Sequence, residues 1–316
     1  MLEDISKKLF EQLKKACDSC KADIISLSGG LDSTILAYYL KEKKPKAITI
    51  ISKDFTASDL TYCQIASKEF ELPLTIISVD TTEILEAIKG TISILKNFND
   101  IEIRNNVVMF LAIKWAKDHG FNRIVTGDGA DELFAGYSFL VKKPEDEIER
   151  EVKRISSIMH FPTQKIGEFL GVSVESPFLD EKIIELANSI PANLKIKTEN
   201  DRKYGKWILR KTFESKIPPQ IAWRDKSPMQ DGAGTKGLTN LFDTIISDDI
   251  FSEKKKKIEQ EHKVAIRSKE SLHYFEIYKN LFGLSRDLSE ENISCPYCHF
   301  NTENSKFCRM CGAYPI

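Results

Sequence analysis

A glycine pair between a predicted strand and a predicted helix constrains this chain more than any other feature of its sequence. The apolar residues 23–27 predict a buried strand, Ser28-Gly29-Gly30-Leu31-Asp32-Ser33 follows directly, and the pattern over 34–40 predicts a helix. Such a turn points several backbone N–H groups and the positive end of the helix dipole at one spot, which suits a phosphate. A Gly-Gly pair taken alone fits an ordinary strand-to-helix turn equally well, and the order of its flanks favours the phosphate loop.

Strands alternate with helices along the first half of the chain. Apolar runs at 23–27, 47–51, 74–79 and 123–126 alternate with helical patterns, and these runs lack the period-two alternation of half-exposed strands. This order favours an α/β fold with a doubly wound parallel sheet, followed by a helical, charged second half from about residue 145. Ligands of such sheets bind at the carboxyl ends of the strands.

A second glycine-rich stretch follows the predicted strand at 123–126. Residues 126–137 read Thr-Gly-Asp-Gly-Ala-Asp-Glu-Leu-Phe-Ala-Gly-Tyr, so three glycines and three carboxylates share twelve positions. Carboxylate oxygens are the ligands that Mg²⁺ on a triphosphate prefers. A solvated acidic loop is the alternative, and the carboxylates alone favour it.

Both stretches resemble motifs of one enzyme superfamily. The loop at 28–33 resembles the pyrophosphate loop of the N-type ATP pyrophosphatases, and it lacks the lysine of a Walker-type loop. Residues 126–137 resemble the asparagine synthetase motif S-G-E-G-x-D-E-x-F-G-G-Y. Further matches to that family follow in order at 176–180, 206–210, 221–226 with 231–234, and 268–275. The resemblance to the synthetase domain of asparagine synthetases runs from about residue 2 to 284 and implies an adenine nucleotide α-hydrolase-like fold.

The resemblance implies a role for each matching residue. It implies catalytic roles for Asp32, Asp131, Lys226 and Asp128: the first two bind Mg²⁺, Lys226 neutralises charge on the α-phosphate of ATP, and Asp128 helps to deprotonate the incoming amine. The residues that it places around the nucleotide are Ser28, Gly29, Gly30, Asp32 and Ser33 at the pyrophosphate, and Leu27, Ile51, Thr126 and Gly127 at the adenosine.

Three departures from the family pattern bear on the substrates. Asp128 stands where the family usually has a glutamate, and Ser173 and Glu175 replace an acidic residue and an arginine, so the acceptor need not be aspartate. The glutaminase domain is absent, and Leu2 stands where glutamine-dependent relatives carry a catalytic cysteine. Ammonia is then expected free from solution, from a separate glutaminase subunit, or not at all.

The cysteines divide into a C-terminal set and an N-terminal pair. Cys295, Cys298, Cys308 and Cys311 form C-x2-C-x9-C-x2-C, which predicts a structural, four-thiolate Zn²⁺ site in a ribbon over 289–316, apart from a synthetase-like domain over 1–288. Disulfides are the alternative, and a reducing compartment disfavours them. For Cys17 and Cys20 we expect plain thiols rather than a redox or metal pair.

Composition excludes some function classes. The formal net charge is −1, which argues against a protein that coats nucleic acid through bulk electrostatics. The chain has no apolar run long enough to cross a membrane and no signal-peptide core, so we expect a cytoplasmic protein.

Two functional hypotheses follow. In the first, the chain is an ATP-dependent amide ligase that adenylylates a carboxylate, foremost the aspartate side chain, and ammonia then displaces AMP. In the second, the same adenylylation chemistry modifies an RNA or a carrier protein that docks on the zinc ribbon. Both hypotheses require ATP and Mg²⁺.

Overall fold

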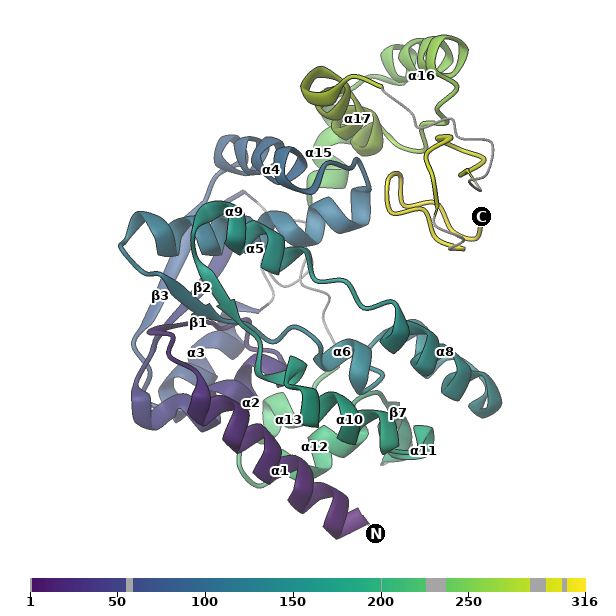
Figure 1. The fold of residues 1–316 in the computed structure, drawn as a ribbon. Helices are drawn as coiled ribbons and strands as arrows, with labels where there is room; N and C mark the ends of the chain where they lie inside the picture. The colour runs from purple at the N-terminus through teal and green to yellow at the C-terminus, as the bar shows by residue number, and fades with distance from the viewer. Residues whose placement is uncertain (1, 55–58, 200, 226–236, 285–293, 303–305) are drawn as a thin grey trace. The chain divides into compact units, whose positions relative to one another are not determined.

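The computed structural model describes residues 2–54, 59–199, 201–225, 237–284, 294–302 and 306–316. The chain divides into two compact units, and several segments contribute to each. The first unit holds residues 1–51, 57–77 and 112–233, and the second holds 52–56, 78–111 and 234–316. Figure 1 labels helices and strands where there is room.

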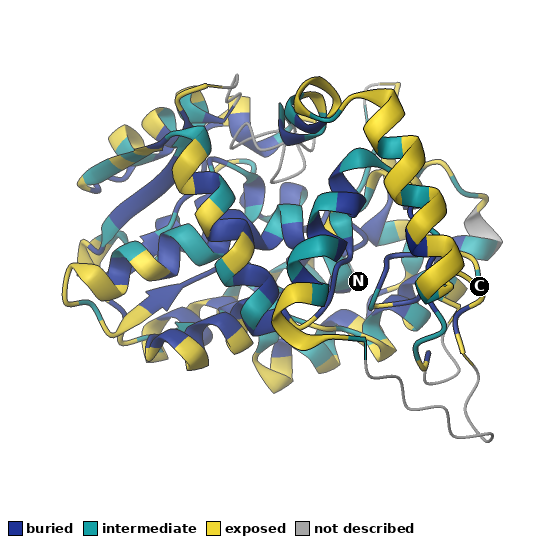
Figure 2. Cartoon of the chain, turned by 90° about the horizontal axis from the view of Figure 1, so that it is seen from above, coloured by how far each residue is buried: buried dark blue, intermediate teal, exposed yellow. Residues whose placement is uncertain are grey.

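A five-stranded sheet organises the first half of the chain. Its strand order is β3-β2-β1-β4-β5, and β1 pairs in parallel with both β2 and β4, as β4 does with β5. Figure 2 colours most residues of β1, β2 and β4 as buried, which agrees with the apolar runs that predicted these strands, whereas β3 and β5 are mostly partly buried or exposed. The strands are β1 (Ile24–Ser26), β2 (Lys46–Ser52), β3 (Leu74–Val79), β4 (Arg123–Val125) and β5 (Ser173–Glu175).

Helices connect and cover these strands. The helix α1 buries Leu9, Leu13 and Ala16 on the predicted stripe, and it contacts α2 and α12. The other helices whose residues fall wholly in this unit are α2 (Leu31–Leu40), α3 (Leu60–Glu69), α6 (Ala130–Leu133), α7 (Ser138–Val141), α8 (Glu145–Ser157), α9 (Pro162–Leu170), α10 (Glu181–Ser189), α11 (Ala192–Lys195), α12 (Trp207–Phe213) and α13 (Pro219–Ala222), with α1 spanning Leu2–Ser19. Two 3₁₀ turns, η1 (Lys41–Lys43) and η2 (Pro177–Leu179), complete the set.

The predicted α/β fold with a parallel sheet is confirmed, and the four strands expected over the first half are all present. The short strand β5 and the antiparallel pair β6 (Lys197–Glu199) and β7 (Arg202–Tyr204) add to the predicted helical second half. Each of these strands has three residues, which is too short for a period-two pattern to be visible.

The second unit is built on α17 (Lys269–Phe282), which contacts α4 (Thr81–Leu95), α15 (Gly237–Ile245) and α16 (Asp248–His262). The helix α5 (Asp100–Asp118) contributes residues to both units. Phe98 and Phe275 meet edge to face with ring centroids 5.2 Å apart. The Arg104 guanidinium binds the buried Glu270 carboxylate through two hydrogen bonds, so this charge is compensated inside the unit.

The four-cysteine segment packs inside the second unit. The Phe98 amide donates to the Met310 carbonyl over 2.9 Å, and Arg267 Nη1 donates to the Gly312 carbonyl over 3.0 Å. The Ala265 amide likewise donates to the Tyr297 carbonyl. These bonds join the segment to the connections before α5 and α17. The predicted domain boundary after residue 288 lies outside the described residues.

Candidate active site

The two glycine-rich loops follow neighbouring strands of the sheet. The loop at 28–33 comes after β1, and the loop at 126–137 comes after β4, which is hydrogen-bonded to β1 although helices and two other strands separate them in sequence. The strand order reverses between β1 and β4, and ligands of open α/β sheets bind at this switch point, outside the carboxyl ends of the strands.

The loop at 28–33 is organised by its own serines. The Ser28 amide donates to Ser33 Oγ over 3.2 Å, and the Gly30 amide donates to Ser28 Oγ over 3.3 Å. The next helix, α2, begins after Gly30, and no described side chain caps its N-terminus. An uncapped helix start offers backbone N–H groups to an anion, as the predicted pyrophosphate site requires.

Gly29 cannot be replaced without moving its surroundings. Its φ of +66° lies in the left-handed region, and a Cβ there would approach the Cys63 backbone nitrogen to 2.6 Å. The Cys63 thiol donates to the Leu27 carbonyl over 3.1 Å, so α3 also fixes the residue before the loop. Burial raises the pKa of this thiol to about 11, which leaves it a packing group.

Lys206 joins the two loops. Its Nζ lies 2.6 Å from Asp32 Oδ2 and 2.7 Å from Asp131 Oδ1. Gly136 makes this approach sterically feasible, because a Cβ on it would lie 1.8 Å from Asp131 Oδ1. The structure therefore brings together the two carboxylates that the resemblance predicted as Mg²⁺ ligands, and it adds a lysine between them.

The Asp32 and Asp131 carboxylates stabilise the charged form of Lys206. Burial alone would lower the pKa of Lys206, but the two carboxylates, Asp131 foremost, outweigh burial and raise it. Lys206 therefore stays an ammonium. The segment 206–210 matches the family, but the sequence predicted no role for Lys206; its position at the start of that motif was the available signal.

Asp128 lies in a partly buried network of hydrogen-bonding side chains. Thr126 Oγ1 lies 2.9 Å from both Asp128 Oδ2 and Ser176 Oγ, and Gln164 donates to the same serine. Burial raises the pKa of Asp128, and hydrogen bonds from Thr126 and Thr163 oppose that rise. A desolvated carboxylate with a raised pKa is a better proton acceptor at neutral pH than an exposed one.

Arg224 holds the first loop against α3. Its Nη1 donates to the Gly29 carbonyl over 3.1 Å, and its Nη2 donates to Asp59 Oδ1 over 2.7 Å. The guanidinium also lies 3.7 Å from the centre of the Tyr62 ring. The sequence predicted no role for Arg224, which belongs to the matched segment 221–226, and the structure places it against the loop at 28–33.

The remaining predicted site residues have mixed outcomes. Lys226 lies outside the described residues, as do residues 231–234. Leu27 belongs to the hydrophobic core, Thr126 is buried, and Ile51 and Gly127 are partly exposed. Their contacts with adenosine stay a prediction.

Glu175, which departs from the family pattern, binds backbone. Its carboxylate accepts hydrogen bonds from the amides of Lys21 and Ala22 at 2.9 Å each and pairs with Arg123. These bonds anchor the connection between α1 and β1. The reversed charge at this position therefore has a structural partner, and Ser173 lies exposed at the start of β5.

The second group of candidate ligands is the C-terminal cysteine set. The sulfurs of Cys295, Cys298, Cys308 and Cys311 lie within 4.8 Å of one another, and all four residues are buried. The two halves repeat one geometry: Cys295 and Cys308 each donate an N–H to the carbonyl five residues later and accept from the amide four residues later. Hydrogen bonds between the thiols lower the pKa of Cys308 and raise that of Cys298. Four converging sulfurs fit a tetrahedral Zn²⁺.

The N-terminal cysteine pair has a different environment. Burial raises the pKa of Cys17, which is fully buried, and raises that of the half-buried Cys20 to about 11. Lys43 Nζ donates to the carbonyls of Cys17, Asp18 and Cys20 and so stabilises the C-terminus of α1. Raised thiol pKa values agree with plain, unreactive thiols.

The arrangement of loops and carboxylates agrees with a family-level comparison. The family model named asparagine synthase matches residues 9–170 and 150–282. The chain belongs to the asparagine synthase family. The glutamine-hydrolyzing asparagine synthetase B of Escherichia coli is 28% identical over 300 residues, which cover 84% of this chain and 52% of that protein. The glutamine-hydrolyzing asparagine synthetase of Zea mays is 25% identical, covering 85% of this chain and 49% of that protein.

This asparagine synthase family member spans about half the length of these two curated relatives. Among solved structures, the NMN synthetase from Francisella tularensis aligns with a TM-score of 0.41 and 14% identity, over 89% of this chain and 93% of that one. That similarity is too low to support a functional argument. In the described parts of the chain, no helix is long and apolar enough to cross a membrane.

Proposed function

We propose that the chain is an ATP-dependent amide ligase. A carboxylate oxygen of the acceptor, foremost the side chain of aspartate, attacks the α-phosphorus of ATP, and pyrophosphate leaves. Ammonia then attacks the acyl carbon, AMP leaves, and the amide nitrogen loses a proton. The observation that carries this proposal is the convergence of Asp32, Asp131 and Lys206 where the two loops meet.

The first step requires that negative charge on the phosphates be held in place. The N–H groups at the start of α2 would bind pyrophosphate, and the Asp32 and Asp131 oxygens fit the preference of Mg²⁺ for carboxylates. Bound there, Mg²⁺ would neutralise charge on the phosphate oxygens. Lys206 would donate to the departing pyrophosphate, and the family resemblance assigns Lys226 to the α-phosphate.

The second step requires a proton acceptor near the acyl group. Asp128 lies three residues after β4 and keeps its carboxyl in a partly buried hydroxyl network. We propose that it accepts a proton from the attacking amine, as the glutamate of the family motif is expected to do.

The nitrogen would arrive as ammonia, either free or from a separate glutaminase. The experiment measures pyrophosphate release from ATP with a panel of amino acids, each with ammonium or with glutamine. We expect aspartate with ammonium to give release and an amide product. Asp32→Asn should abolish pyrophosphate release without unfolding the protein. Asp18→Asn alters an exposed carboxylate that pairs with Lys14, and it should leave pyrophosphate release intact.

The same assay separates the two hypotheses. If no small carboxylate stimulates release but an RNA or carrier protein does, the acceptor is macromolecular. If Asp32→Asn retains full activity with any acceptor, the site assignment is wrong.

We also propose that Cys295, Cys298, Cys308 and Cys311 bind one Zn²⁺. Four buried sulfurs within 4.8 Å support the proposal, and a reducing, cytoplasmic location would keep them as thiols. Four protein ligands leave no open coordination position, so the metal would be structural.

A further inference from the structure

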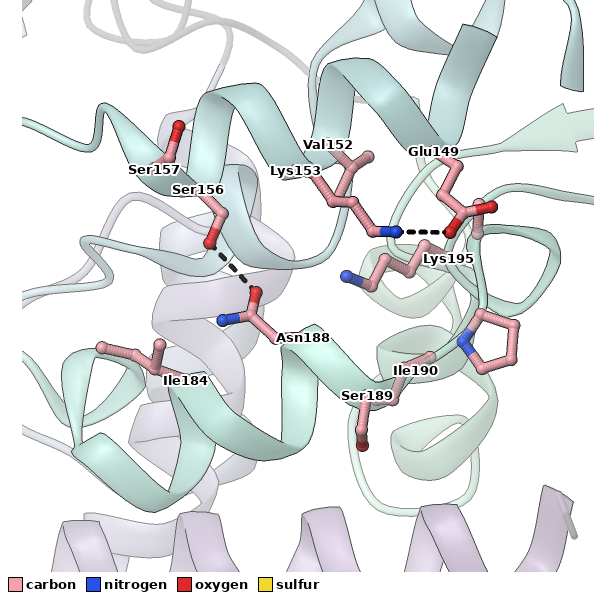
Figure 3. A pocket seen from close by; sticks show the side chains of 12 residues that line it. Glu149, Val152, Lys153, Ser156, Ser157, Ile184, Asn188, Ser189, Ile190 and Lys195 are labelled. Carbon is pink, nitrogen blue, oxygen red and sulfur yellow. Dashed lines mark hydrogen bonds and ion pairs between the residues drawn. The ribbon is translucent and has the colours of Figure 1, made fainter. Parts of the chain in front are cut away.

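A cavity of about 540 Å³ lies beside α8, α10 and α11, all within the first unit (Figure 3). Lys195, the last residue of α11, lines this cavity together with polar residues of α8 and α10. The cavity has both an apolar side and a polar side. The apolar lining residues are Val152, Ile184, Ile190, Pro191 and Ala192, and the polar ones are Glu149, Lys153, Ser156, Ser157, Asn188, Ser189 and Lys195.

Lys195 is the unusual member of this lining. Its side chain is almost fully buried, with a relative exposure of 2% for the residue. Figure 3 shows its amine pointing into the cavity, with Lys153 and Asn188 on either side. Within the described part of the chain, no carboxylate pairs with this amine. Lysine is rarely buried without a partner, because desolvating an ammonium costs several kcal/mol.

The other polar groups of the cavity are mostly engaged with protein. Lys153 pairs with Glu149 over 2.8 Å, so these two charges cancel. Ser156 donates to Asn188 Oδ1 over 3.0 Å, which leaves the Asn188 amide nitrogen as a donor. Ser157 and Ser189 donate to carbonyls of their own helices. The Lys195 amine and the Asn188 amide nitrogen are therefore the lining donors that the described part of the chain leaves without a protein acceptor, and Lys153 keeps further N–H groups beside its ion pair.

Burial lowers the basicity of the Lys195 amine. Burial lowers its pKa to about 8, and no neighbouring charge opposes that effect. The charged residues that line the cavity from α8 are the paired Glu149 and Lys153, and α10 contributes none. The helix α12, which contacts α11, directs Arg210 to backbone carbonyls and Lys211 to two glutamates.

We propose that this cavity binds a small organic monocarboxylate, with Lys195 and Asn188 as donors to the carboxylate. One uncompensated cation matches one negative charge. The apolar side, formed by Val152, Ile184 and Ile190, matches a short hydrocarbon tail rather than a fully hydrated inorganic ion. The proposal concerns a site apart from the residues assigned to ATP cleavage, so its outcome does not depend on that activity.

The experiment titrates the full-length protein with sodium butyrate by isothermal titration calorimetry at pH 6.5 and pH 8. Binding an anion stabilises the ammonium form, so the pKa of Lys195 rises on binding. At pH 8, near the unliganded Lys195 pKa of about 8, the protein should take up close to half a proton per site when butyrate binds. At pH 6.5 it should take up almost none. Repeating the titration in buffers of different ionisation enthalpy measures that uptake.

Lys195→Met keeps the buried stem and removes the charge, and it should weaken butyrate binding at least 10-fold. Asn188→Ala alters an exposed residue, so it should fold even if Lys195→Met does not, and it should weaken binding several-fold. Lys182→Met on α10, a lysine outside the cavity lining, should change nothing. Phosphate should bind more weakly than butyrate.

Three results would overturn the proposal. These are no saturable butyrate binding, binding that Asn188→Ala and a folded Lys195→Met leave unchanged, or equal affinity for phosphate and butyrate. If butyrate does not bind saturably, the Lys195 amine is simply hydrated through the cavity.

Discussion

The Lys206 ammonium lies 2.6 Å from the Asp32 carboxylate, although 174 residues separate the two in sequence. The same ammonium reaches Asp131 at 2.7 Å, so one cation serves two carboxylates from two different loops. Such a cluster keeps a net negative charge, which suits a site that must still attract a divalent cation. The carboxylates come from the segments after β1 and β4, and the lysine precedes α12.

Replacing Lys206 tests this cluster directly. Lys206→Met should slow pyrophosphate release about 10²–10³-fold, because a positioned cation at the leaving phosphate is lost. It also removes the ammonium that lies between the Asp32 and Asp131 carboxylates. Added Mg²⁺ should therefore raise the melting temperature of this variant more than that of the wild type, as differential scanning fluorimetry can measure.

Lys211→Met is the matched control, since Lys211 lies on α12, the helix that follows Lys206, and pairs with Glu199 and Glu214. It should leave both pyrophosphate release and the Mg²⁺ response unchanged. Equal Mg²⁺ responses in Lys206→Met and the wild type would argue against Asp32 and Asp131 as a metal site.

Arg224 is expected to act by positioning the phosphate loop. Arg224→Lys keeps a charge but cannot bond the Gly29 carbonyl and Asp59 at once while covering Tyr62. We expect pyrophosphate release to fall about 10–100-fold, with a raised KM for ATP, because a hydrogen bond to a charged group is lost. Arg202→Lys, at an exposed ion pair, should have no effect. A change in kcat with an unaltered KM would contradict a positioning role.

The raised pKa of Asp128 predicts a pH dependence. Burial favours its protonated form in the fold, so this group costs stability as pH rises from the ordinary aspartate value through the raised one. As a proton acceptor it must be ionised, so amide formation should rise with pH through that same raised pKa.

A pH–rate profile checks this expectation. Asp128→Asn should be slow and should lose the acidic limb of the profile, whereas Asp128→Glu, which restores the residue of the family motif, should retain the limb. An unchanged limb in Asp128→Asn would assign it to another group.

Removing zinc should loosen the second unit. Elemental analysis should find about one Zn per chain, and Cys308→Ser should lose it, whereas Cys20→Ser should keep it. Because the Phe98 amide donates to the Met310 carbonyl, hydrogen exchange at Phe98 should accelerate after chelation. Full zinc content in Cys308→Ser would exclude the four-sulfur site.

The sequence alone predicted the fold class correctly, and most of the candidate site residues were predicted from it as well. Apolar runs without alternation predicted the parallel strands, because a strand buried on both faces needs apolar residues at every position. The spacing of Cys295, Cys298, Cys308 and Cys311 likewise predicted the sulfur cluster. These features are local, so a short window of sequence contains them.

The tertiary structure decided which of these local features meet. The strand order places β1 beside β4, and only that neighbourhood allows Asp32, Asp131 and Lys206 to share charge. It also gave Glu175 a backbone partner and left Lys195 buried at a cavity whose one lining carboxylate, Glu149, pairs with Lys153. Burial and distance between residues far apart in the chain depend on packing of the whole unit, and no local pattern of residues encodes them.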